Sequence, residues 1–185
     1  MKIRILIMLL ICFQINVSAQ DKLKIGDRAP AILIKHYLKN KPADTDLKNK
    51  YILLEFWATW CTSCLKETPK INSLTKKYAN RRDIRFISIT HEKPEKTKAT
   101  LSKVEFNSIV VSDDTSTTLK NFIADEEGGY SIPKTILIDP NGIIRWVGTT
   151  MKLNPELFAK FLANKTIEVA DETPFDIPAP TFTKN

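Results

Sequence analysis

Two cysteines three positions apart, Cys61 and Cys64, constrain this chain more than any other feature of its sequence. They follow an apolar run, residues 51–57, that is typical of a strand buried on both faces, and they open a segment with helical spacing. The amides of a first helical turn lack partners within the helix, and the helix dipole places partial positive charge there. We therefore expect a stabilised thiolate at Cys61.

The position of Cys64, one turn later, favours a resolving role. We expect Cys61 to attack a disulfide and Cys64 to attack the resulting mixed disulfide. A structural role is disfavoured, because two intervening residues close a loop too short to constrain the unfolded chain much. The remaining cysteine, Cys12, lies in a segment that is predicted to be removed.

The first nineteen residues have the pattern of an export signal. Lys2 and Arg4 precede an apolar stretch, residues 5–13, and Val17-Ser18-Ala19 supplies the small residues that come before a cleavage site. The stretch is shorter than the ~20 residues that a transmembrane helix needs. We predict cleavage after about Ala19 and a periplasmic or secreted protein; an uncleaved membrane anchor is the alternative.

The remaining chain is predicted to form one domain, residues 20–165, followed by a proline-containing tail or linker, residues 166–185. The tail lacks hydrophobic periodicity and contains Pro174, Pro178 and Pro180. The formal net charge is +7, but acidic residues are spread among the basic ones, so no nucleic-acid partner is expected.

Strands and helices are predicted to alternate along the domain. Strands are expected over residues 51–57, 84–90, 108–112, 134–138 and 143–147, and helices over residues 62–78, 94–104, 115–124 and 156–163. Pro69 is expected to kink the first helix, and Asp114 to cap the third. Residues 139–142, Asp-Pro-Asn-Gly, predict a hairpin turn. This order indicates an α/β sandwich with a mixed sheet.

A metal site competes with the redox interpretation of the cysteine pair. Zinc needs four ligands, and the mature chain adds only His36 and His91 to the two cysteines. A c-type haem requires histidine where Leu65 stands. We therefore predict no metal and no cofactor besides a redox-active disulfide.

Several motifs occur together in this chain. They are Glu55-Phe56-Trp57-Ala58-Thr59-Trp60-Cys61-Thr62-Ser63-Cys64, Gly26 to Pro30, Glu67-Thr68-Pro69 and Tyr130-Ser131-Ile132-Pro133-Lys134-Thr135. With these motifs, roughly residues 24–165 resemble the thioredoxin superfamily, in particular its TlpA/ResA-like exported disulfide reductases. The resemblance implies a thioredoxin fold: a three-layer α/β/α sandwich with a central mixed β-sheet and an inserted helix–strand element over residues 94–125.

The resemblance also implies roles for three residues beside the cysteines. Pro133 is expected in the cis form facing the dithiol, which leaves the Ile132 backbone free to pair with a substrate strand; a trans turn is the alternative. Glu55 matches the buried acid of thioredoxins, with a raised pKa and a role in passing protons to and from Cys64. The alternative for Glu55 is an edge position reaching solvent.

Residues around the dithiol are expected to form the substrate surface. Trp60 is predicted to belong to a flat apolar surface that partners touch, whereas Trp57 is predicted to pack in the core. Thr62 and Ser63 lie between the cysteines, and their hydroxyls can hydrogen-bond the thiolate. Many relatives carry proline at the position of Ser63, so the reduction potential cannot be carried over from them.

The resemblance implies a thiol-disulfide oxidoreductase, a reductase rather than an oxidase. Its expected partners are exported protein thiols and disulfides and an upstream electron donor in the membrane or periplasm. One alternative is a peroxiredoxin-like peroxidase, which is disfavoured because its reactive cysteine lies in a different local pattern. Another is a binding module in which the dithiol is incidental. His91 fits a surface loop or the substrate groove, and His36 a structural role.

Overall fold

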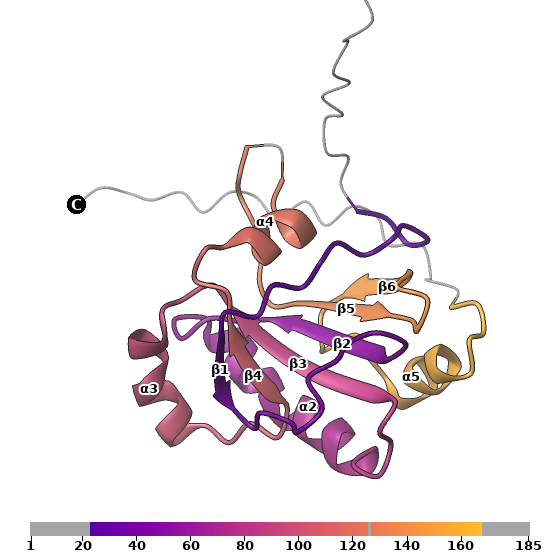
Figure 1. Ribbon diagram of the computed structural model, residues 1–185, viewed down its shortest axis with the longest axis horizontal. Coiled ribbons are helices and arrows are strands. Elements are labelled where there is room, and N and C mark those ends of the chain that lie inside the picture. Colours follow the sequence, from indigo (N-terminus) through magenta and orange to yellow (C-terminus); the bar gives the residue numbers. More distant parts are fainter. Residues whose placement is uncertain (1–22, 126, 168–185) are drawn as a thin grey trace, which may run out of the picture.

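The computed structural model describes residues 23–125 and 127–167, so the predicted export signal and nearly all of the predicted tail lie outside it. Six strands and four helices alternate in the described residues (Figure 1). They are β1 His36–Lys39, β2 Tyr51–Phe56, α2 Thr62–Lys77, β3 Ile84–Thr90, α3 Pro94–Lys103, β4 Ile109–Ser112, α4 Thr117–Ile123, β5 Lys134–Ile138, β6 Ile144–Gly148 and α5 Pro155–Leu162.

The strands form one mixed sheet in the order β1-β4-β3-β2-β5-β6. Strand β2 pairs in parallel with β3, and β3 in parallel with β4, whereas the β1–β4, β2–β5 and β5–β6 pairs are antiparallel. Every residue of β2 and β3 is buried, as expected of central strands covered on both faces. The loops that follow β2 and β3 therefore leave the sheet at the same edge.

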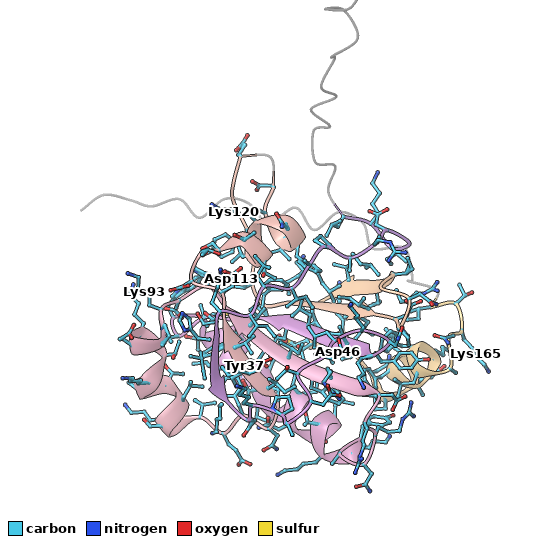
Figure 2. The ribbon with its side chains drawn as sticks, in the orientation of Figure 1. Tyr37, Asp46, Lys93, Asp113, Lys120 and Lys165 are labelled. Carbon is cyan, nitrogen blue, oxygen red and sulfur yellow. A yellow bond between two sulfur atoms is a disulfide. The ribbon has the colours of Figure 1, made fainter. Side chains whose placement is uncertain are left out.

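Two apolar layers cover the sheet, and side chains fill the space between the layers (Figures 1 and 2). Helices α2 and α5 cover one face, where Ile71, Leu74, Phe158 and Phe161 pack on β2, β3 and β5. Helix α4 and the N-terminal segment cover the other face. The predicted α/β/α sandwich with a mixed sheet is confirmed. Within the described residues, none of the helices has the length and apolarity needed to cross a membrane.

Local sequence signals account for several element ends. Asn154 caps α5 by accepting a hydrogen bond from the Leu157 amide at 2.8 Å, and Pro155 occupies the first helical turn. The predicted hairpin joins β5 to β6, and Gly142 has a φ of 77°, which favours glycine. Pro69 lies inside α2, which continues to Lys77.

The predicted cap of α4 is wrong, because the helix begins at Thr117 with Ser116 in the N-cap position. Asp113, which follows β4 and is labelled in Figure 2, accepts a hydrogen bond from the Thr118 amide in the first turn at 2.7 Å. Asp114 instead forms an ion pair with His36, with 3.5 Å between Nε2 and Oδ2. The sequence did not predict β1, whose short edge strand carries His36 beside β4. The structural role expected of His36 stays a prediction.

Candidate active site

The cysteine pair lies where β2 gives way to α2. Cys61 is the N-cap of α2 and forms a disulfide with Cys64. Cys61 keeps 5% of its surface exposed, whereas Cys64 is fully buried. The Cys64 sulfur lies 4.0 Å from the Phe56 carbonyl oxygen at the end of β2. The outer sulfur is thus the one that an approaching disulfide meets first.

Two groups of α2 approach the Cys61 sulfur. The Cys64 amide donates a hydrogen bond to it at 3.2 Å, and the Ser63 hydroxyl lies 3.5 Å away. Both contacts, together with the partial positive charge of a helix N-terminus, favour the thiolate form of Cys61 in the reduced protein. The predicted strand–helix placement is confirmed, and Ser63 is brought to the sulfur that it was expected to influence.

The Ile132–Pro133 peptide bond is cis, as predicted. The Ile132 side chain packs against the apolar cluster that contains Trp57, Cys61 and Cys64, which brings this loop to the dithiol. The expected pairing of the Ile132 backbone with a substrate strand stays a prediction.

Glu55 is buried in the centre of the sheet, with 1% of its surface exposed. Burial raises its pKa to about 8, although a hydrogen bond of 2.8 Å from the Ser88 hydroxyl acts in the opposite direction. Ser88 is itself hydrogen-bonded to the Ser108 hydroxyl at 2.8 Å. The interpretation of Glu55 as an edge residue reaching solvent is wrong, and its proton-transfer role stays a prediction.

The two tryptophans near the site differ in exposure: Trp57 lies in the core as predicted, and the contact of Trp60 with partners stays a prediction. Trp57 is 1% exposed and packs on Phe106, whereas Trp60 is 60% exposed beside Cys61. Thr62 and Ser63 are exposed on the first turn of α2. An exposed apolar ring beside an almost buried sulfur offers a contact surface for a partner.

Sequence reasoning missed two buried carboxylates near the dithiol. Glu67, one turn after Cys64, accepts a hydrogen bond from the Met151 amide at 3.2 Å, and its pKa is raised mainly by burial. Glu92 follows β3 and accepts hydrogen bonds from Thr59. For Glu92 the signal is one of topology, because the ends of the parallel strands β2 and β3 meet at one edge of the sheet.

His91 lies on the same edge as the dithiol. Its Nε2 is 3.2 Å from the Tyr130 hydroxyl, and the two rings meet edge to face. His91 therefore bridges the loop after β3 to the segment that leads into cis-Pro133. Across residues 23–125 and 127–167, histidines, cysteines and acidic residues form no cluster of three that could hold a metal ion.

Comparison with known proteins places the chain in a family. A model of the AhpC/TSA family matches residues 25–147. The thioredoxin-like protein YneN of Bacillus subtilis (strain 168) is 32% identical over 135 residues, which cover 71% of this chain and 76% of the relative. The chain belongs to the AhpC/TSA family and is a TlpA/ResA-like member of the thioredoxin superfamily.

Two further similarities agree with this placement of the chain. The thiol-disulfide oxidoreductase ResA of Bacillus thuringiensis subsp. konkukian (strain 97-27) is 26% identical, with 75% of this chain and 82% of the relative covered. A thiol-disulfide oxidoreductase from Bacteroides fragilis NCTC 9343 shares the fold, with a TM-score of 0.57, 22% identity, and 75% and 98% of the two chains covered. With the Cys61–Cys64 disulfide, the protein is a thiol-disulfide oxidoreductase, and the peroxidase alternative has less support.

Proposed function

We propose that this protein is a reductase that transfers electrons from its Cys61–Cys64 dithiol to disulfides of exported proteins. The observation that carries the proposal is the asymmetry of the pair. Cys61 caps α2 and receives the Cys64 amide on its sulfur, whereas Cys64 is fully buried beneath it. One sulfur is placed to attack a partner, and the other to finish the exchange.

The reaction begins with the reduced protein. The Cys61 thiolate attacks one sulfur of the substrate disulfide, and the other substrate sulfur leaves as a thiolate that takes a proton. Cys64 then loses its proton and attacks the Cys61 sulfur of the mixed disulfide, which releases the second substrate thiolate. Two electrons pass to the substrate, and the protein is left with its disulfide.

Glu55 is proposed to accept the proton of Cys64. It lies on β2 next to Phe56, whose carbonyl oxygen is 4.0 Å from the Cys64 sulfur. Burial raises the pKa of Glu55 to about 8, which brings this acid nearer to the range of a thiol than an ordinary carboxyl and suits it to exchange a proton with Cys64.

The substrate is proposed to bind as an extended segment across the dithiol. The Ile132 backbone would pair with that segment, and the exposed Trp60 ring would contact its apolar side chains. Thr62 and Ser63, exposed between the cysteines, would face the same segment. This arrangement presents the substrate disulfide to Cys61.

The export of the protein and its electron donor also belong to this proposal. The signal pattern of residues 1–19 supports a periplasmic or secreted location. In such a compartment disulfides are common, and a donor at the membrane or in the periplasm would return the disulfide to the dithiol.

Two cysteine variants test the proposal. Cys61→Ser should abolish insulin reduction, whereas Cys64→Ser should accumulate a mixed disulfide through Cys61. Unchanged insulin reduction in Cys61→Ser would refute Cys61 as the nucleophile. Peroxide turnover that survives in Cys64→Ser would favour the peroxidase, and a pair that cannot be reduced would favour a binding module.

A further inference from the structure

The buried carboxylate Glu92 holds the turn that leads into Cys61. Only 9% of Glu92 is exposed, although it follows β3 at the edge of the sheet where loops meet solvent. Its Oε2 accepts a hydrogen bond from the Thr59 amide at 2.6 Å, and its Oε1 accepts one from the Thr59 hydroxyl at 2.9 Å. Both carboxylate oxygens are thus fixed on a residue two positions before Cys61.

Glu92 is itself held in place. Its amide donates a hydrogen bond to the Thr90 hydroxyl at 3.2 Å, and its carbonyl accepts one from the Ser112 hydroxyl at 2.6 Å. On the side of the dithiol, the Cys61 amide donates to the Ala58 carbonyl at 3.1 Å, which closes the turn around Thr59. The Glu92 carboxylate is therefore tied, through Thr59, to the turn that leads into Cys61.

The charge of Glu92 acts on other groups of this edge. Burial lowers the pKa of His91, and the Glu92 carboxylate opposes that effect, whereas Lys96 on α3 adds to it. Burial and Glu92 together raise the pKa of Tyr130. A negative charge fixed in a poorly solvated place acts in the same way on any anion that forms nearby, including a cysteine thiolate.

We propose that Glu92 is a positioning residue that fixes the turn before Cys61 and, through its charge, sets the balance between dithiol and disulfide toward the disulfide. The inference rests on the proposed function, since it assigns the reducing direction of that site. The reduced protein carries a thiolate at Cys61 that the oxidised protein lacks. Repulsion from Glu92 therefore disfavours the reduced form and makes the dithiol a stronger electron donor.

This effect opposes the contacts that stabilise the thiolate. The first turn of α2, with the Cys64 amide and the Ser63 hydroxyl, stabilises the Cys61 thiolate, whereas the charge of Glu92 destabilises it. The reduction potential of the cysteine pair reflects both effects. Removal of the Glu92 charge should therefore leave the stabilising contacts of α2 unopposed.

The test compares Glu92→Gln with Glu95→Gln. The first variant removes the buried charge and keeps an oxygen that can accept the Thr59 amide, and the second removes the same charge from an exposed position on α3. The pKa of Cys61 is measured from thiolate absorbance, and the dithiol–disulfide equilibrium is measured against glutathione buffers. We expect Glu92→Gln to lower the Cys61 pKa and to shift the equilibrium at least threefold toward the dithiol, while Glu95→Gln matches the wild type.

Glu92→Asp separates charge from packing, because it keeps the charge and shortens the side chain. Values close to the wild type in Glu92→Asp, with a shift in Glu92→Gln, support the inference. Equal shifts in both variants, or none in Glu92→Gln, overturn it. These readouts do not depend on reductase activity, so a failure of insulin reduction in the wild type would count against the proposed function alone.

Discussion

Two buried carboxylates, one within β2 and one directly after its neighbour β5, differ in how surrounding groups compensate a negative charge. Glu55 in β2 and Asp139 at the β5–β6 turn are each 1% exposed. The Oδ1 of Asp139 accepts hydrogen bonds from the amides of Asn141 and Ile143, both at 2.9 Å, and its Oδ2 pairs with the Arg145 guanidinium at 2.7 Å. Within the described residues, Glu55 receives a hydrogen bond from the hydroxyl of Ser88.

This difference indicates a structural role for Asp139 and a reactive role for Glu55. Amide donors and a cation compensate the buried charge of Asp139, so the carboxylate fixes the hairpin. A single hydroxyl does not compensate the burial of Glu55, and its pKa rises to about 8. The acid beside the dithiol is thus the one whose proton can be exchanged near neutral pH.

Loss of the Asp139 carboxylate is expected to have the largest effect on the free energy of unfolding. Asp139→Ala removes the hydrogen bonds of the turn and the partner of Arg145, so the free energy of unfolding should fall by about 3 kcal/mol. Urea denaturation measures this change, with exposed Asp46→Ala as the control. Reductase activity per folded molecule should be unchanged. If Asp139→Ala unfolds with a free energy close to that of the wild type, Asp139 does not stabilise the hairpin, and its contrast with Glu55 is refuted.

Glu55→Gln should act on the rate of exchange. Without the acid, deprotonation of Cys64 slows, and we expect a tenfold to hundredfold slower release of the mixed disulfide, which is about 1.4 to 2.7 kcal/mol in activation free energy. Stopped-flow measurement of the resolution step tests this. The fold should be kept, because glutamine carries no charge to bury. Wild-type kinetics in this variant would exclude Glu55 from proton transfer.

The contribution of Glu55 to the stability of the folded protein should fall as the pH rises from about 4.5 to about 8. The unfolded protein loses the Glu55 proton near its ordinary pKa of 4.5, whereas the folded protein keeps it until about 8. The unfolded state thus binds fewer protons in this window, and the contribution of Glu55 falls by up to about 1.4 kcal/mol per pH unit. The difference in unfolding free energy between the wild type and Glu55→Gln, followed against pH, isolates this slope. A flat difference would mean that Glu55 is ionised in the folded protein.

Ser88→Ala is expected to give the smallest effect. The Ser88 hydroxyl lowers the pKa of Glu55, so its removal should move the midpoint of the pH–rate profile upward and cost about 1 kcal/mol of stability. The exposed Ser102→Ala serves as the matched control. A midpoint that stays in place would show that Ser88 does not set the protonation of Glu55.

The sequence predicted most of the fold because its signals are local. The apolar run before Cys61, the Asp139–Gly142 turn and the Asn154-Pro155 start of α5 each determine structure within a few residues. Strand β1 escaped prediction, because a four-residue edge strand gains its order from pairing with β4 across the fold. The α4 cap was misplaced for a related reason: either neighbouring carboxylate fits the pattern, and the path of the chain after β4 brings Asp113 to the first turn of the helix.

The site was predictable where its residues are close in sequence or lie in a shared motif. Cys61, Cys64, Glu55 and Pro133 belong to that group. Glu92 does not, because its partner Thr59 is 33 positions away and only the parallel pairing of β2 and β3 brings the two loops together. Contacts of this kind follow from topology and leave no local sequence pattern.

The redox titration of the Cys61–Cys64 pair tests the central claim most directly. We predict a single, fully reversible two-electron transition between disulfide and dithiol, with a midpoint more reducing than roughly −200 mV. A pair that does not interconvert across thiol–disulfide buffers would contradict the assignment of the dithiol as the active site. A midpoint near roughly −120 mV, as in a strong oxidant, would contradict its proposed role as a reductase.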